Sequence, residues 1–319
     1  MYQFRLGKIG KTSESGTDWL AATALCMALL GIATASILIA IASTELAANA
    51  ITCDRLLIAS LVFYIWNVFT TSNVDDDETS SYTVTVRAIF LLLIAGISFA
   101  ISLSLWAWSL TQTSIANSTL LNNMMPIFTT IGGWLIFHQR FSLKFLMGII
   151  VAILGAIAIG IEDLQVADSN LLGDSAALTA AMFSAISILT IEQLRVQFST
   201  AIVMQWTSLA GGLFMLPLVL LGSDRLLPIS NTGWLAIVAL GLISQAMGQG
   251  LLTYSLAKFP SSFVAVSMLA IPVIAAILAL IIFSEQLSLF NWLLFAVVLS
   301  GIYLAISAKQ SNLEIPKIE

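Results

Sequence analysis

The chain has 319 residues, of which 59% are hydrophobic and only 9% are charged. Its mean hydropathy is +1.00, and because soluble domains carry roughly a quarter charged residues, a soluble globular fold is excluded. The 12 Lys and Arg against 17 Asp and Glu give a net charge of -5, which argues against a nucleic-acid partner. The partners indicated are a lipid bilayer and a small-molecule solute.

Ten apolar segments are each long enough to cross the roughly 30 Å hydrocarbon core of a bilayer as an α-helix. In chain order they cover residues 19–42, 49–69, 88–110, 115–137, 143–161, 173–194, 200–222, 232–257, 261–283 and 289–308. The loops between them are short and leave no room for a separate soluble domain. We therefore predict an all-α integral membrane protein with ten transmembrane helices.

The distribution of Lys and Arg predicts the orientation, because short basic loops stay on the cytoplasmic side. If both tails are inside, ten of the twelve basic residues fall on the inner side, and only Arg225 falls in an outer loop. Residues 1–18 lack a signal-peptide cleavage pattern, so the first helix is expected to be retained. We expect a multi-pass protein of the cytoplasmic (inner or plasma) membrane, with tails 1–18 and 309–319 in the cytoplasm.

The sequence also repeats itself at a constant offset of 146 residues. This offset aligns a proline, the end of one apolar segment and the start of the next: Pro126 with Pro272, Ile136-Phe137 with Ile282-Phe283, and Ser142-Leu143 with Ser288-Leu289. The repeat predicts two halves of five helices each, residues 19–162 and 173–308. Because five is an odd number, the second half must be inverted relative to the first, which is the plan of many transporters.

Both halves resemble the EamA family of drug/metabolite transporters. The resemblance is carried by residues 117–155 around Pro126, and by residues 262–301 around Pro272 with the turn Ser284-Glu285-Gln286-Leu287-Ser288. In that family the fourth and ninth helices end in a Gly-Glu-x-x-Ser-like turn, whereas the first copy here reads His138-Gln139-Arg140-Phe141-Ser142. Arg55 matches an Arg that is common near the start of the family's second helix. The resemblance implies a transporter but leaves the substrate open, since members export amino acids, amines, nucleobases and other metabolites.

Polar residues at membrane depth are costly and are therefore candidates for a solute site. Asn122 and Asn123 stand beside Pro126, and Pro272 lies in the ninth segment. Both prolines are predicted to kink their helices and to free backbone carbonyls near the midplane. The alternative is that the amides only join helices within the bilayer.

The eighth segment adds Gln245 and Gln249, which are one helical turn apart and are expected to share a face. Trp106 and Tyr254 are predicted to pack against the apolar part of a solute. Aromatic residues of the membrane interface are the alternative for both.

Asp54 and Arg55 are the ionisable residues clearly inside a span, near its start. Because they are adjacent on a helix, they should point in different directions. Gating or coupling of transport and snorkelling toward the headgroups are both open for this pair. Asp54 is the candidate for proton coupling.

An enzyme, a cofactor site or a metal site is not expected, because the single His138 has no second ligand at metal spacing and no phosphate-binding glycine loop occurs. We predict an exporter that works by alternating access on a neutral, zwitterionic or amphipathic metabolite such as an amino acid, since deep charges are scarce. The alternative is a non-transporting integral membrane subunit of a larger complex. Formation of a homodimer, the driving ion and the direction of transport are not determined by the sequence.

Overall fold

The computed structural model describes residues 14–71, 85–113, 118, 121–162, 171–222, 225–283 and 289–308. Within these ranges every regular element is a helix. The predicted tail 309–319 lies outside the described residues, and so do residues 1–13 of the predicted tail 1–18. The first helix begins at Glu14, five residues before the predicted start of its span.

The described part of the first half forms α1 (Glu14–Ala33), α2 (Ala35–Ala42), α3 (Ala48–Thr71), α4 (Val86–Gln112), α6 (Met125–Phe137) and α7 (Leu143–Glu162). The second half forms α8 (Leu171–Arg195), α9 (Thr200–Leu221), α10 (Asn231–Ala239), the π-helix η2 (Leu240–Gln249), α11 (Gly250–Ser255), α12 (Ser261–Met268), α13 (Ile271–Phe283) and α14 (Leu289–Ile306). Most of these bounds lie within a few residues of the apolar segments, because the apolar length sets where each helix can end.

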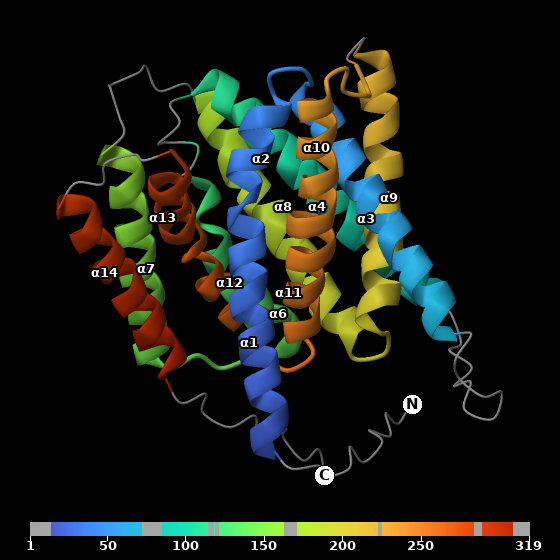
Figure 1. The fold of residues 1–319 in the computed structure, drawn as a ribbon. Helices are drawn as coiled ribbons and strands as arrows, with labels where there is room; N and C mark the ends of the chain where they lie inside the picture. The colour runs from blue at the N-terminus through green and yellow to red at the C-terminus, as the bar shows by residue number, and fades with distance from the viewer. Residues whose placement is uncertain are drawn as a thin grey trace.

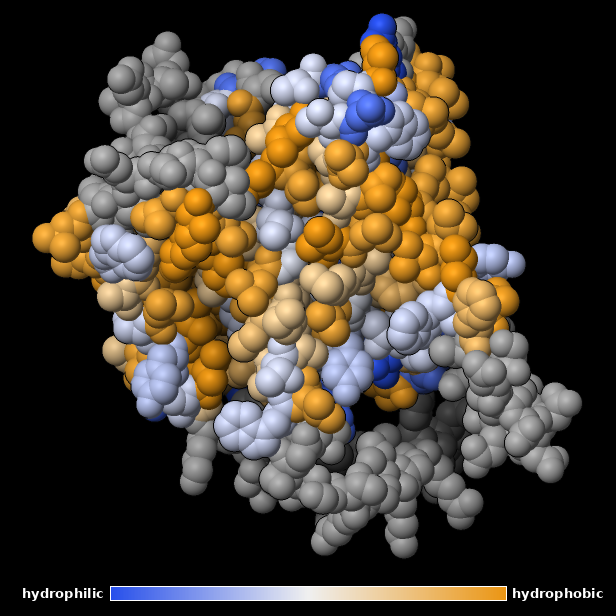
Figure 2. All heavy atoms as spheres, in the orientation of Figure 1, coloured by the Kyte–Doolittle hydropathy of each residue, from blue (hydrophilic) through white to orange (hydrophobic). Residues whose placement is uncertain are grey.

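Seven helices of the described residues are long and apolar enough to cross a membrane, and three shorter apolar helices accompany them: Met125–Phe137, Leu143–Ala158 and Trp292–Ile306. The outer surface carries many exposed large apolar side chains, which suit contact with lipid tails. Figure 2 shows them as a broad band over the side of the bundle, with the most hydrophilic residues toward its two ends. The protein is thus an integral multi-pass membrane protein, while the count of ten spans stays a prediction.

The two proline-containing segments are interrupted rather than bent. In the first, Asn123 and Met124 form a turn, and α6 begins only at Met125, with Pro126 in its first turn. In the second, Leu269 and Ala270 form a turn between α12 and α13, and Pro272 follows Ile271 at the start of α13. A proline suits the first turn of a helix because it lacks an N–H that would be unpaired there. The expected kinks are therefore helix breaks, and their positions differ by the same 146 residues as the sequence repeat.

The halves pack on each other through antiparallel helix pairs. The second helices pair as α3 with α9, where the Ser60 hydroxyl donates to the carbonyl of Gln205 at 3.2 Å. The fifth helices pair as α7 with α14, which lie side by side at one edge of the bundle in Figure 1. The first helix of each half packs on the third of the other, α1 against η2 and α11, and α8 against α4. Such an exchange of partners is what a two-fold relation between inverted repeats requires.

Two equivalent glycines show this symmetry at atomic detail. A Cβ atom added to Gly301 of α14 would lie 2.3 Å from the backbone nitrogen of Ala152 in α7. A Cβ atom added to Gly155 of α7 would lie 2.9 Å from the backbone nitrogen of Val298 in α14. Gly155 and Gly301 are 146 positions apart, and so are Ala152 and Val298. Small residues at these positions let the two backbones approach closely, as is usual for helix pairs in membranes.

His138 ends α6 in the left-handed conformation, with a φ of 53°. It occupies the position where the resemblance expects Gly, the residue that adopts positive φ without steric cost. The turn then places the Ser142 hydroxyl to accept from the backbone N–H of Phe145 at 3.2 Å, so Ser142 caps the start of α7. His138 thus has a defined structural position at a helix end. The second copy of this turn, including Glu285 and Ser288, lies outside the described residues.

Candidate functional site

A cavity of about 380 Å³ lies where the two helix breaks meet the rest of the bundle. Its wall includes Asn122, Asn123, Met125 and Pro126 from the first break. Met268, Leu269, Ile271 and Pro272 supply the equivalent wall from the second break. Helices α1, α2, α3, α4, α8 and η2 complete the lining. A volume of this size is within the usual range for sites that enclose a small organic molecule.

Most of the residues predicted for the site lie on this cavity. Its lining contains Arg55, Trp106, Asn122, Asn123, Pro126, Gln249 and Pro272. They come from five elements that are distant in the sequence, and the predicted grouping of polar residues near the proline breaks is present in the structure.

Arg55 of α3 is the strongest polar feature of the wall. Its side chain is only 4% exposed, and its Nε and Nη2 atoms donate to the Oε1 atom of Gln245 at 3.0 and 2.7 Å. Gln245 itself is 1% exposed and does not line the large cavity. Gln245 therefore holds the guanidinium in place from behind, and Gln249 is the glutamine that faces the cavity. A helix of π type over Leu240–Gln249 changes the angular spacing of the two glutamines, which the assumption of an α-helix did not foresee.

Asp54, the neighbour of Arg55, is also buried but is not part of the cavity wall. Its Oδ2 atom has no hydrogen-bond partner within the described part of the chain. This placement agrees with the expectation that Asp54 and Arg55 point in different directions. It does not agree with the snorkelling alternative, because Asp54 is only 7% exposed and Arg55 only 4%, so neither side chain reaches the headgroups.

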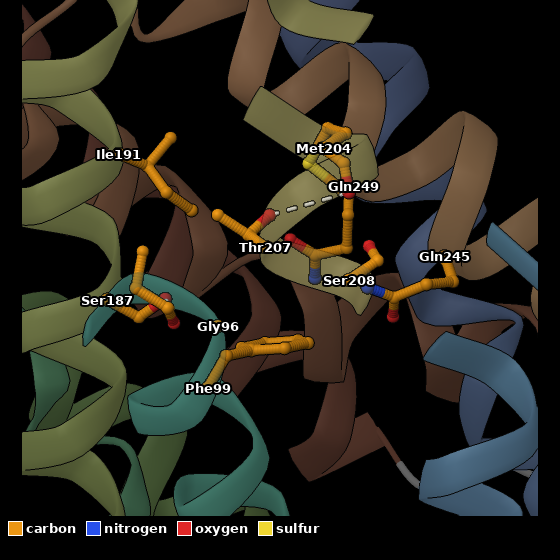
Figure 3. Close-up of a pocket in the computed structure, with 10 residues that line it drawn as sticks. Gly96, Phe99, Ser187, Ile191, Met204, Thr207, Ser208, Gln245 and Gln249 are labelled. Atoms are coloured by element: carbon orange, nitrogen blue, oxygen red, sulfur yellow. Dashed lines mark hydrogen bonds between the residues drawn. The ribbon is translucent and has the colours of Figure 1, made fainter. Parts of the chain in front are cut away.

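A second, smaller cavity of about 20 Å³ lies beside the first and shares Phe99 and Gln249 with it. Figure 3 shows Gln245 and Gln249 together with Thr207 and Ser208 of α9 around this space. The Ser208 hydroxyl is buried and has no hydrogen-bond partner among the described residues. The space is about the size of one water molecule, which such a polar lining would accommodate.

Tyr254 is a third predicted site residue, after Gln245 and Asp54, that the structure does not bring to the large cavity. It lies on α11 with 37% of its surface exposed, and it lines neither cavity. The residue 146 positions earlier, Trp108, is also exposed, by 45%. Both therefore face the outside of the bundle, which agrees with the alternative of an aromatic residue at the membrane interface. The assignment of Tyr254 to the solute site is corrected accordingly.

The sequence prediction missed Ser184 and Phe99 of the wall, whereas Ser102 lies in the same helical register as the predicted Trp106. Ser102 of α4 and Ser184 of α8 both line the cavity, and their hydroxyls lie 2.6 Å apart. Phe99, one helical turn before Leu103, forms part of the apolar side. Serine, phenylalanine and alanine are too common in membrane helices to stand out, so only the packing of α4 against α8 could have identified them.

Comparisons with known proteins agree with this architecture. The model of the EamA-like transporter family matches residues 19–161 and again residues 171–307. A protein of Bacillus subtilis (strain 168) named "Uncharacterized transporter YetK" is 23% identical over 244 residues, which cover 74% of this chain and 73% of that protein. A solved structure described as "Crystal structure of protein" shares the fold, with a TM-score of 0.75 at 15% identity, covering 93% of this chain and 100% of the other.

The family match covers both halves in the order that the repeat predicts, and it includes both helix breaks that form the cavity. The described helices pair across the halves as inverted repeats do. This chain is a membrane transporter protein that belongs to the EamA-like transporter family.

Proposed function

We propose that this protein exports a small neutral, zwitterionic or amphipathic metabolite, such as an amino acid, by alternating access. The observation that carries the proposal is that the interrupted helices of both halves meet at one cavity of about 380 Å³. Interrupted helices near the bilayer midplane are where transporters of inverted-repeat design bind their solutes. The polar groups of Asn122, Asn123 and Gln249 would orient the solute, and Trp106 would cover its apolar part.

Alternating access requires the halves to separate at one end of the bundle at a time, and one end is joined by contacts that can separate. Where α6 ends and α12 begins, Glu192 of α8 accepts from the backbone N–H of Ser261 at 3.0 Å. The Gln139 amide donates to the other oxygen of Glu192 at 3.5 Å and accepts from Ser262 at 3.4 Å. These polar contacts tie the turn after α6 in the first half to α12 in the second. They support a closed state of this end that opens during transport.

We further propose that this end faces the cytoplasm of a cell bounded by its inner or plasma membrane. Four described basic residues lie at helix ends on this side of the bundle: Arg140 and Lys144 near the junction of α6 and α7, Arg195 at the end of α8, and Lys258 between α11 and α12. Arg225 precedes α10 at the other end. An excess of Lys and Arg on one side marks the cytoplasmic side.

The proposal is tested by uptake and efflux in vesicles reconstituted with the purified full chain. Mixed amino acids and related metabolites are offered with and without a pH gradient. The double variant Asn122→Ala, Asn123→Ala should lose most transport while keeping its thermal midpoint. Asn231→Ala, at the exposed start of α10, is the matched control and should transport as the wild type does.

Two results would contradict the proposal. Transport at wild-type rate in the double variant would move the site away from the cavity. No flux of any offered solute would favour the non-transporting subunit instead.

In a transporting preparation, Asp54→Asn is expected to remove the effect of the pH gradient on solute flux. A pH effect that persists in this variant would exclude Asp54 from proton coupling.

A further inference from the structure

The lining of the large cavity has an uncompensated positive character. Among the described residues that line it, Arg55 is the one with a charged side chain. Only 4% of the Arg55 surface is exposed. Within the described part of the chain, no carboxylate forms an ion pair with this guanidinium. A buried charge without a counter-charge is unfavourable, and it becomes favourable when a ligand of opposite charge binds.

The guanidinium is held but is not fully used. The guanidinium of Arg55 has three nitrogens, and two of them, Nε and Nη2, donate to the single oxygen atom Oε1 of Gln245. The Nη1 atom has no protein acceptor among the described residues. Arg55 is thus oriented by one neutral partner and keeps N–H donors for another. A planar guanidinium with free donors is well suited to a carboxylate.

Two further donors of the wall lack partners. The indole Nε1 of Trp106 and the amide Nδ2 of Asn123 are buried, and neither has a hydrogen-bond acceptor in the described residues. Both side chains belong to the lining of the same cavity as Arg55. An indole nitrogen and an amide nitrogen can only donate, so their missing partner must be an acceptor. Orphaned donors in a native site call for a ligand or water that accepts from them.

The half-helices add to this preference. The first turns of α6 and α13, each the start of a 13-residue helix, form part of the wall through Pro126 and Pro272. The N-terminus of a helix carries about half a positive charge and favours an anion nearby. The same arrangement therefore occurs twice, once from each half of the protein.

We propose that the cavity selects solutes that carry a carboxylate, which Arg55, Trp106 and Asn123 bind together. The inference rests on the proposed transport function and narrows its substrate class. Amines without a carboxylate are rejected, because a cationic group meets Arg55 and no acidic side chain of the described wall. The apolar part of such a solute packs against Phe99, Leu103 and Leu269, which line the same space.

The test compares matched ligands on the purified full chain. The probes are 3-phenylpropionate, 3-phenylpropanamide and 3-phenylpropylamine, together with L-leucine and L-leucinamide. Binding is measured by ligand-induced thermal shift and by calorimetry, because an uncharged amide crosses lipid unaided and confuses flux assays. Each acid is expected to bind about tenfold or more tightly than its amide, and the amine is expected not to bind.

Variants separate charge recognition from folding. Arg55→Gln should reduce the preference for acid over amide to about unity, and Arg55→Lys should restore part of it. Because a buried arginine variant can fail to fold, Asn123→Asp provides an independent test: its added carboxylate should weaken binding of the acid and not of the amide. Asn231→Asp makes the same chemical change at the exposed start of α10 and should leave binding unaltered.

Equal binding of acid and amide by the wild type would overturn the carboxylate proposal, and so would equal effects of Asn123→Asp and Asn231→Asp. If the carboxylate proposal fails but the vesicles still transport some solute, the proposed transport function stands and only the preference for a carboxylate is withdrawn. If no probe of any charge binds and the vesicles transport nothing, both proposals fail.

Discussion

At the scale of single residues, Arg55 and Gln245 show how a buried charge is tolerated within a membrane bundle. Both are almost fully buried, and two hydrogen bonds join α3 to η2 through them. The pair links the second helix of the first half to the third helix of the second half. The acceptor is a neutral amide oxygen and not a carboxylate, which leaves the positive charge of Arg55 available to the cavity.

Gln245→Leu is expected to destabilise the protein, because Arg55 then keeps its burial and loses its acceptor. Hydrogen bonds to charged groups contribute about 1.5–3 kcal/mol, so the free energy of unfolding should fall by about that amount. The measurement is thermal or denaturant unfolding of the purified protein in detergent. Gln245→Glu keeps an acceptor oxygen and should be much less destabilised; equal loss in both variants would contradict this role.

Glu45 is a second residue whose partner lies in the other half. It lies between α2 and α3 and accepts from the backbone N–H groups of Ile229 at 2.8 Å and Ser230 at 3.1 Å, and from the Ser230 hydroxyl. The Ser230 hydroxyl and these backbone donors hold the pKa of the Glu45 carboxyl below its usual value near 4.5. The contact therefore stabilises the protein while the carboxylate is ionised.

The lowered pKa sets the sign of a pH effect. Stability from Glu45 is fully present above its unfolded pKa and is lost as the pH falls through its lower folded pKa. The thermal midpoint of the wild type should exceed that of Glu45→Gln at pH 7, and the difference should vanish on acidification to well below pH 4.5. A difference that is independent of pH would show that the charge of Glu45 does not contribute.

At the scale of elements, the helix breaks at Asn123–Met124 and Leu269–Ala270 are the features on which the cavity depends. Each replaces part of a transmembrane helix with a turn, and each brings polar or backbone groups to the cavity wall. The following proline stabilises the break, because a proline inside a continuous helix is about 3 kcal/mol less favourable than alanine.

Pro126→Ala and Pro272→Ala should therefore favour a continuous helix by up to about 3 kcal/mol each and close part of the cavity. We expect slower solute flux in vesicles with no loss in thermal midpoint. Pro217→Ala in α9, an exposed proline away from both cavities, makes the same change and should not slow transport. Wild-type flux in both break variants would show that the interruptions are not required.

At the scale of the whole molecule, the two halves are held by antiparallel helix pairs that a two-fold relation exchanges. The pair α7 and α14 lies at the edge of the bundle and packs through Gly155 and Gly301. Because the two contacts are equivalent, the two halves should respond alike to the same change.

Gly155→Val and Gly301→Val are each expected to lower the free energy of unfolding by about 1–3 kcal/mol, since the added side chain forces the backbones apart. Unfolding of the purified variants measures this. Ser300→Val, on the exposed face next to Gly301, adds similar bulk toward the outside and should cost far less. A large effect at one glycine and none at the other would contradict the equivalence of the halves.

Much of the architecture could be predicted from the sequence, for reasons that act locally. The length of each apolar run sets helix ends such as those of α3, α9 and α14 close to their predicted positions. The repeat at 146 residues predicted equivalent kinks at Pro126 and Pro272, because proline acts on its own helix, and the structure has helix breaks at these positions. The adjacent Asn122 and Asn123 could be assigned to the cavity for the same reason.

The remaining features were decided by the tertiary structure, because the direction of a side chain depends on helix rotation and on the partner helix. The rotation of α3 turns Arg55 into the cavity and leaves Asp54 out of its wall. The π-helix η2 places Gln245 behind Arg55 and Gln249 in front, and α11 turns Tyr254 outward. The sequence by itself determined a membrane bundle of two related halves, each with a proline that disturbs its fourth helix. Only the packing of those halves created a cavity and gave it a positive charge.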